Sequence, residues 1–356
     1  MSSGRVESWL LALADPLGPR GVLPEHPLRR GQPAQLIQSA DDHGVLPAVV
    51  ANLKKTIAQW GQDRILSAPA RGKPQPEGQL PCDEISAALA DANQRLLGRT
   101  AFTLMLRRQW QTLAVPLAER GIPAMVIKGP DFADRLYSHA GLRPFRDIDL
   151  LTPREARPEV ESTMAQVGYQ RAPQPPLKHA QEYGEETWRL ADRGSSGGVE
   201  VHWNLVNSPA MRASISVEYG DLQLDAPPTG VGLPRPSPGA QLLIAAVHGA
   251  ASHRFDRLQL LCDVCQAARG LAGPLDEAWL RGTAQRTGSS LALATALALS
   301  GRALGEPACQ ELLGRLGLPS PGWLVEGLLS PSAVLGLNTR LSTIRRQLFR
   351  ELLKRR

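Results

Sequence analysis

A short apolar run that ends at a glycine and a proline most constrains how this chain can fold. Residues 124–127, Ala-Met-Val-Ile, contain no polar side chain, and Lys128-Gly129 ends the run. Such a run is typical of a buried strand, and Pro130 suits the first turn of a helix, where a backbone amide has no partner within the helix. A strand that leads directly into a helix predicts an α/β unit here.

Helical patterns surround this unit on both sides. We predict an N-terminal helical region over residues 1–63 and a Pro/Gly-rich linker or surface loop over residues 64–82. Residues 83–238 hold the core, led by a long helix that we expect to be interrupted near Pro116. Residues 239–356 form a C-terminal helical region with a basic tail. The predicted fold class is therefore α/β, of the α+β kind, with a small core flanked by helical regions.

Two aspartates one residue apart are the first candidates for chemistry. In the strand-like segment 147–151, Asp-Ile-Asp-Leu-Leu, side chains alternate between faces, so Asp147 and Asp149 share a face. Two residues of strand separate their backbones by ~6.6 Å, so both carboxylates can bind one hard cation or a pair of cations. Neighbouring acids on a buried strand repel each other, and a metal ion removes that repulsion.

A predicted hairpin supplies a third carboxylate. Residues 187–190 and 199–203 have strand patterns, and the Gly/Ser-rich segment between them predicts a turn. Glu200 and His202 alternate with apolar residues, which include Trp203, and we expect the apolar set in the core. If this strand lies beside the aspartate strand, three carboxylates surround one site, and oxygen ligands of this kind are those that Mg²⁺ prefers. His202 either neighbours the metal and holds Glu200 or is a structural histidine.

A phosphate-binding turn is expected just upstream. Gly129 lets a phosphate approach the backbone, and the following helix end favours an anion. Lys128 adds a full positive charge, although a lysine at a strand end is equally well explained as a surface charge. Arg143 and Arg146 could hold further phosphate oxygens by paired hydrogen bonds, or could neutralise the aspartates without any metal.

These segments resemble a known family. Residues 127–137 (IKGPDFADRLY), 142–151 (LRPFRDIDLL) and 199–203 (VEVHW) are similar to the uncharacterised nucleotidyltransferase family of the DNA polymerase beta superfamily. A later stretch, from His248 to Asp263, looks like that family's helical His and Asp segment. The resemblance, over about residues 124–271, implies a mixed sheet with flanking helices. It also implies metal-binding roles for three acids and a nucleotide-binding role for one glycine: Asp147, Asp149, Glu200 and Gly129.

The activity implied is transfer of a nucleoside monophosphate from a triphosphate to an acceptor with release of pyrophosphate. ATP is the expected triphosphate, Mg²⁺ (or Mn²⁺) the expected cofactor, and a small molecule, peptide or protein the expected acceptor. The alternative is a catalytically degenerate fold that binds a nucleotide or a protein. The Gly-Ser or Gly-Gly pair of the wider superfamily is here Gly129-Pro130, which removes one backbone donor.

Two other motifs have simpler explanations. Cys262 and Cys265, with His248 and His253 nearby, invite a zinc site, but the cysteines lie in a Leu-rich helical pattern and Cys309 is remote, so we expect buried structural thiols. Residues 194–198 match Gly-x-Ser-x-Gly, yet a strand follows them where a nucleophile elbow requires a helix, so we expect a turn.

The net charge and the cysteine content limit which partners the protein can bind and which cellular compartment it can occupy. The net charge of +6 favours an anionic partner such as a nucleotide. Part of the excess lies in the terminal helical pattern, for which we expect a solvated face, with nucleic-acid or membrane-surface contact as the less favoured alternative. Its basic residues are Arg345, Arg346, Arg350, Lys354, Arg355 and Arg356. Four cysteines, no secretory pattern and no apolar run of membrane length predict a cytoplasmic protein.

Overall fold

The computed structural model describes residues 3–19, 23–61, 81–173, 183–191, 197–227, 232–337 and 339–354. The predicted linker, the centre of the Gly/Ser-rich turn and the last two arginines therefore lie outside the described residues, or almost entirely so. Among the residues described, no helix has both the length and the apolar character needed to cross a membrane.

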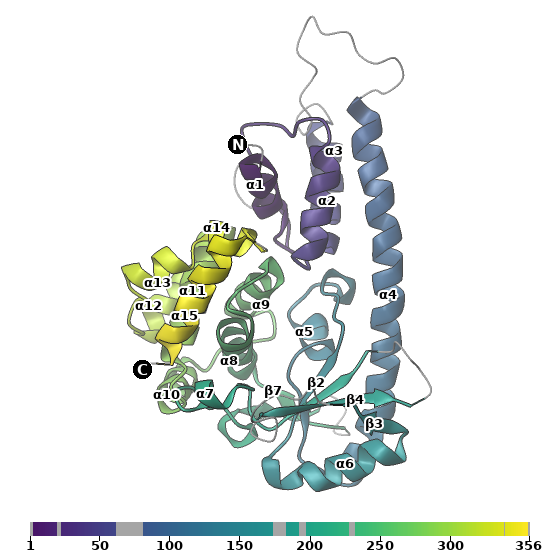
Figure 1. The fold of residues 1–356 in the computed structure, drawn as a ribbon, viewed down its shortest axis with the longest axis vertical. Helices are drawn as coiled ribbons and strands as arrows, with labels where there is room; N and C mark the ends of the chain where they lie inside the picture. The colour runs from purple at the N-terminus through teal and green to yellow at the C-terminus, as the bar shows by residue number, and fades with distance from the viewer. Residues whose placement is uncertain are drawn as a thin grey trace, which may run out of the picture.

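A five-stranded mixed sheet lies at one end of the molecule, below the helical regions in Figure 1, and confirms the predicted fold class. Its strand order is β1-β2-β5-β4-β3, and the β2–β5 pair is parallel whereas the other pairs are antiparallel. The strands are β1 (Met125–Val126), β2 (Ile148–Leu151), β3 (Tyr169–Arg171), β4 (Glu185–Leu190) and β5 (Val199–His202). The predicted hairpin is β4–β5, while the short edge strand β3 was not expected from the sequence. A separate two-stranded ribbon pairs β6 (Leu224–Asp225) with β7 (Arg235–Pro236).

One face of the sheet packs on two helices. Ile148, Leu150 and Val201 point into a buried cluster with Leu113 of α4 (Pro81–Glu119) and Met164 of α6 (Arg157–Gln166). These strand residues alternate with the acids, as period-two alternation predicts. The acidic side chains therefore lie on the opposite face.

The 39-residue helix α4 runs the length of the molecule in Figure 1, from the N-terminal helices to the sheet. The predicted interruption near Pro116 is wrong, because the helix continues to Glu119. A proline removes the amide hydrogen bond to the residue four positions earlier and crowds that turn, and a long, packed helix tolerates this near its end.

The described N-terminal residues form the helices α1 (Ser3–Leu13), α2 (Gln32–Asp42) and α3 (Leu46–Trp60). Within the predicted helical region 1–63, Gly44 separates α2 from α3, because its φ of +72° is incompatible with the interior of a helix. Both α2 and α3 contact the upper part of α4 (Figure 1).

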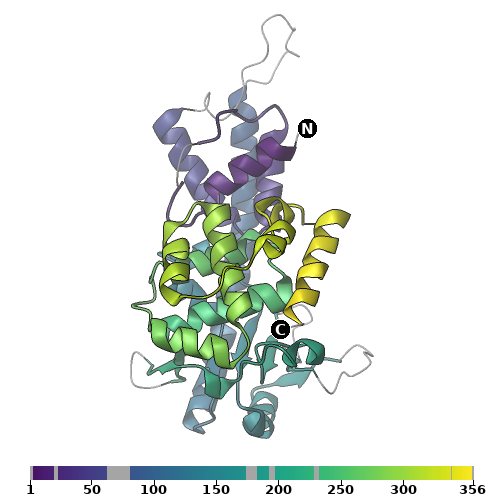
Figure 2. The ribbon, with the colours of Figure 1, turned by 90° about the vertical axis from the view of Figure 1, so that its left-hand side faces the viewer.

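The described residues of the C-terminal region are mostly helical, as predicted, and cover the acidic face of the sheet. Figure 2 shows it between the N-terminal helices and the sheet. Its segments are α8 (Pro238–Val247), the π-helical η6 (His248–His253), α9 (Leu258–Ala268), α10 (Glu277–Arg286), α11 (Ser290–Leu304), α12 (Pro307–Leu316), α13 (Trp323–Leu328), α14 (Pro331–Leu335) and α15 (Arg340–Leu353). A single buried apolar cluster joins these helices to α1, α2 and α3. Short helices α5 (Pro130–Arg135) and α7 (Pro209–Arg212) complete the fold.

Candidate active site

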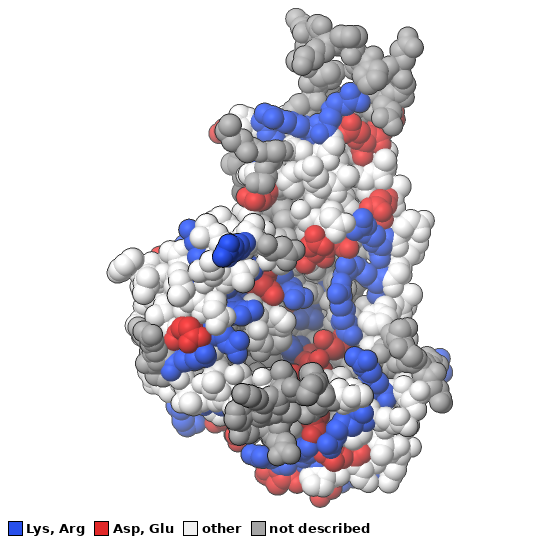
Figure 3. Space-filling model, viewed as in Figure 1, with Lys and Arg blue, Asp and Glu red and all other residues white. Residues whose placement is uncertain are grey.

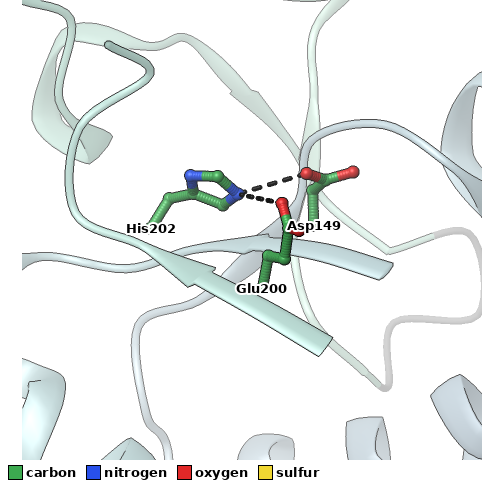
Figure 4. A group of neighbouring side chains, drawn as sticks. All are labelled: Asp149, Glu200 and His202. Atoms are coloured by element: carbon green, nitrogen blue, oxygen red, sulfur yellow. Dashed lines mark hydrogen bonds and ion pairs between the residues drawn. The ribbon is translucent and has the colours of Figure 1, made fainter. Parts of the chain in front are cut away.

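The parallel pairing of β2 and β5 brings two predicted acids side by side. Asp149 is opposite Glu200 in the register, so their side chains project from the same face of the sheet (Figure 4). Asp147 immediately precedes β2 and lies close enough to raise the pKa of Glu200 through its charge. Asp149 and Glu200 therefore lie together, whereas Asp147 is not part of the group of potential metal ligands that the described residues form, which is Asp149, Glu200 and His202.

His202, two residues beyond Glu200, completes the group. Its Nε2 lies 3.1 Å from Asp149 Oδ1 and 3.7 Å from Glu200 Oε2 (Figure 4). Its Nδ1 lies 3.3 Å from Glu185 Oε2. Potential ligand atoms of Asp149, Glu200 and His202 all fall within 4.8 Å of one another. Burial alone would lower the pKa of His202, but the hydrogen bond to Asp149 and the charge of Glu185 raise it. Of its two predicted roles, the geometry gives His202 the position beside the acids.

Lys128, two residues after β1, contacts the same Asp149 carboxylate. Its Nζ lies 2.7 Å from Asp149 Oδ1 and 3.1 Å from His248 Nδ1, and only 8% of the residue is exposed, so the surface-charge alternative is wrong. Burial would raise the pKa of Asp149, yet Lys128 and His202 hold it below its usual range. Burial and the Lys128 charge lower the pKa of His248 well below its ordinary value, so a neutral imidazole faces the ammonium.

The remaining acids are destabilised as anions. Burial, followed by the charge of Asp149, raises the pKa of Asp147 and raises that of Glu200 to about 7. Four carboxylates therefore face one ammonium and one imidazole at this site, from Asp147, Asp149, Glu185, Glu200, Lys128 and His202. The raised pKa values of Asp147 and Glu200 reflect burial and this excess of acidic groups, and the oxygen-rich donor set suits a hard divalent cation.

Arg143 does not hold either aspartate of the predicted pair. Its Nε and Nη2 donate to Asp263 Oδ1 and Oδ2 at 2.7 and 2.8 Å, and Tyr137 donates to the same carboxylate at 2.7 Å. The paired hydrogen bonds that the sequence assigned to phosphate oxygens thus go to Asp263 in this structure. Arg146, by contrast, is exposed.

Gly129 adopts a conformation that requires glycine, with φ +54° and ψ −112°. A Cβ at this position would lie 3.0 Å from the Asp147 carbonyl oxygen, so the bare Cα allows this close approach within the chain. The expected anion site at the helix end is weaker than predicted. Helix α5 has only six residues, Pro130 has no amide hydrogen, and the Asp131 amide donates to the Lys128 carbonyl.

One cavity of about 900 Å³ is bordered by the acids of the site and by the basic groups around them: Asp147, Asp149, Glu185, Glu200, Lys128, His202, His248, Arg143 and Arg146, together with Gly129. The cavity lies between the sheet, α4 and the C-terminal helices, and Figure 3 shows Lys and Arg side chains on both sides of the hollow. Its size suits a nucleotide-sized ligand. Sequence reasoning missed Glu185, which faces His202 across the β4–β5 pair, because one isolated glutamate in a strand carries no motif.

The cysteines form no metal site among the residues described. Cys262, Cys265 and Cys309 are buried free thiols, as expected, but Cys309 is not remote in space: its Sγ lies 3.7 Å from that of Cys265. The described part of the chain contains one group of potential metal ligands, Asp149, Glu200 and His202. Most of the Gly-x-Ser-x-Gly segment lies outside the described residues, although β5 does follow it.

Comparison with known proteins adds the family. No curated protein and no solved structure matches the chain. Residues 30–305 match the family described as uncharacterised nucleotidyltransferase. Because this match covers well over half of the 356 residues and includes every acid of the site, the chain belongs to the uncharacterised nucleotidyltransferase family.

Proposed function

We propose that the protein transfers a nucleoside monophosphate from a nucleoside triphosphate to an acceptor hydroxyl and releases pyrophosphate. The observation that carries this proposal is the pairing of Asp149 with Glu200 in register on one sheet face, beside Asp147, at the border of a ligand-sized cavity. ATP is the expected donor. A small molecule, a peptide or a protein remains the expected acceptor, and nucleic acid is less favoured.

Asp147, Asp149 and Glu200 would hold Mg²⁺ or Mn²⁺, with His202 at their side. Such an ion supplies charge stabilisation at the α-phosphate and activates the acceptor hydroxyl. Among the chain's own groups, Glu200 would orient that hydroxyl and accept its proton. Lys128 and Arg146 supply positive charge along the cavity for phosphate oxygens.

The first test is transfer itself. The protein is incubated with α-labelled triphosphates, Mg²⁺ and candidate acceptors, and labelled product is measured together with pyrophosphate release. Asp149→Asn should reduce the rate by at least about 100-fold, because a metal ligand contributes several kcal/mol to transition-state stabilisation. Asp91→Asn, which alters an exposed acid of α4, should retain the full rate. Absence of product with every acceptor, together with metal-independent nucleotide binding, would refute the proposal.

A second candidate is a nucleotide-binding module without turnover. Two observations favour it: Lys128 already pairs with Asp149, and Pro130 removes a backbone donor beside Gly129. Calorimetry with ATP and Mg²⁺ separates the two candidates when it is combined with the transfer assay. A module would bind the nucleotide with an affinity that depends on Asp149 and would form no product.

A further inference from the structure

The terminal helix α15 reaches the candidate active site, although its residues lie beyond the 30–305 match to the family. The sequence predicted that the basic residues of this helix form a solvated face. That prediction is wrong for two arginines of the helix. Arg346 is buried and donates to the carbonyls of Ala333 and Leu337 at 3.1 and 2.7 Å. Arg350 is half-buried and lines the cavity that holds the acids.

Arg350 belongs to a wall that the C-terminal region builds. Ser252 and His253 of η6 and Arg257, the residue before α9, line the same cavity. Helix α15 is docked on this segment by two contacts. The Phe349 and Phe255 rings are 6.3 Å apart, and Arg254 Nη1 donates to Gln347 Oε1 at 3.1 Å. We name Ser252, His253, Arg257 and Arg350 the basic wall.

The basic wall has more positive charge than its neighbours neutralise. Asp256 is the carboxylate partner of two of these residues: its Oδ1 lies 3.0 Å from Arg257 Nε, and its Oδ2 lies 3.8 Å from His253 Nδ1. Within the described residues, no carboxylate lies within 4.0 Å of Arg350, and its buried Nε has no hydrogen-bond partner. A half-buried guanidinium without a counter-charge is unfavourable, so an anion in the cavity would improve its energy.

The backbone of the wall is also unusual. The segment His248–His253 forms a π-helical turn, and Arg254 and Phe255 follow it with φ of +55° and +51°. Positive φ is strained for residues other than glycine, and for a bulky residue such as Phe255 it is a marked outlier. Strain and π-turns concentrate where side chains must be placed for function. Here they place Ser252 and His253 at the cavity.

We propose that the basic wall is a binding subsite for a phosphoryl group within the active-site cavity. The assignment of that group rests on the proposed function: it belongs either to the terminal phosphates of the nucleotide or to a phosphorylated acceptor. Arginine supplies the paired donors that phosphate oxygens accept, and the Ser252 hydroxyl supplies one more.

The subsite is tested by isothermal titration calorimetry, in which inorganic pyrophosphate is titrated into the full-length protein in magnesium-free buffer. Arg350→Gln should weaken binding about tenfold, the loss expected for one charge-assisted contact. Arg345→Gln is the matched control, since Arg345 lies on the same helix and does not line the cavity. Arg350→Lys should retain part of the affinity, and circular dichroism checks that each variant folds. No binding to the unaltered protein, or equal affinities for the two glutamine variants, would overturn the proposal.

A second titration identifies the source of the group. Pyrophosphate is added to protein saturated with a non-hydrolysable ATP analogue and Mg²⁺. Competition assigns the basic wall to the nucleotide's terminal phosphates, whereas Arg350-dependent binding beside the analogue assigns it to a phosphorylated acceptor. Pyrophosphate binding without metal does not depend on catalysis. A failure of the nucleotidyl-transfer assay would therefore not by itself refute the phosphoryl subsite, and a failure of pyrophosphate binding would not refute nucleotidyl transfer.

Discussion

The backbone at Gly129 yields the sharpest prediction about a single residue. Gly129→Ala should lower the free energy of unfolding by roughly 2–3 kcal/mol, because the methyl group meets the Asp147 carbonyl and φ and ψ leave the regions open to alanine. Gly121→Ala is the control. Gly121 also has positive φ, +63°, but nothing lies within 4 Å of an added Cβ, so about 1 kcal/mol is expected. Urea denaturation measures both, and equal losses would contradict the role of the close approach.

Individual side chains show what the sequence can and cannot reveal about the site. Alternation along a strand is a local property, so the common face of Glu200 and His202 follows from spacing alone, whereas the position of Asp149 opposite Glu200 depends on the β2–β5 register. The pairing of Lys128 with Asp149 depends on how β1 aligns with β2, where the Ile127 amide donates to the Asp149 carbonyl at 3.0 Å. A two-residue strand carries too little pattern to fix such a register.

Between elements, the Arg143–Asp263 pair ties the segment before β2 to α9. Both side chains are buried, and Tyr137 also donates to Asp263, so removal of the carboxylate leaves a buried guanidinium without a partner. Asp263→Ala should therefore cost about 3–5 kcal/mol of stability. Tyr137→Phe removes one hydrogen bond and should cost about 1 kcal/mol.

Chemical denaturation of the two variants tests this tie. A small loss for Asp263→Ala, comparable with that for Tyr137→Phe, would show that water or another group compensates Arg143. The double variant Arg143→Met with Asp263→Leu serves as a further control. It removes both charges, so it should recover much of the stability that Asp263→Ala loses.

Element types followed from the sequence better than element ends did. Periodicity identified the hairpin and the helical regions, because amphipathic spacing reflects which face is buried. It failed at Pro116, where packing of α4 outweighs a local helix breaker, and at the basic terminal helix. There the arginine spacing alone could not show that Arg346 caps carbonyls of a neighbouring turn.

The whole molecule should unfold in one cooperative transition. Helices α1–α3 share one buried apolar cluster with the C-terminal helices, and buried Arg269 bridges Asp15 and Glu306 across these regions. The boundaries predicted at residues 63, 82 and 238 mark changes in sequence pattern and stay predictions. Scanning calorimetry should give a calorimetric enthalpy equal to the van't Hoff enthalpy. Two resolved transitions would instead show that the N-terminal helices melt independently.

The register between β2 and β5 also restricts which insertions and deletions the chain can tolerate. Glu200 lies beside Asp149 because the register fixes which residues of β5 project from the same face of the sheet as Asp149. One residue gained or lost inside β5 would turn the glutamate toward the apolar layer over α4 and α6. The four residues of β5 therefore cannot change in number without loss of the pairing between Asp149 and Glu200.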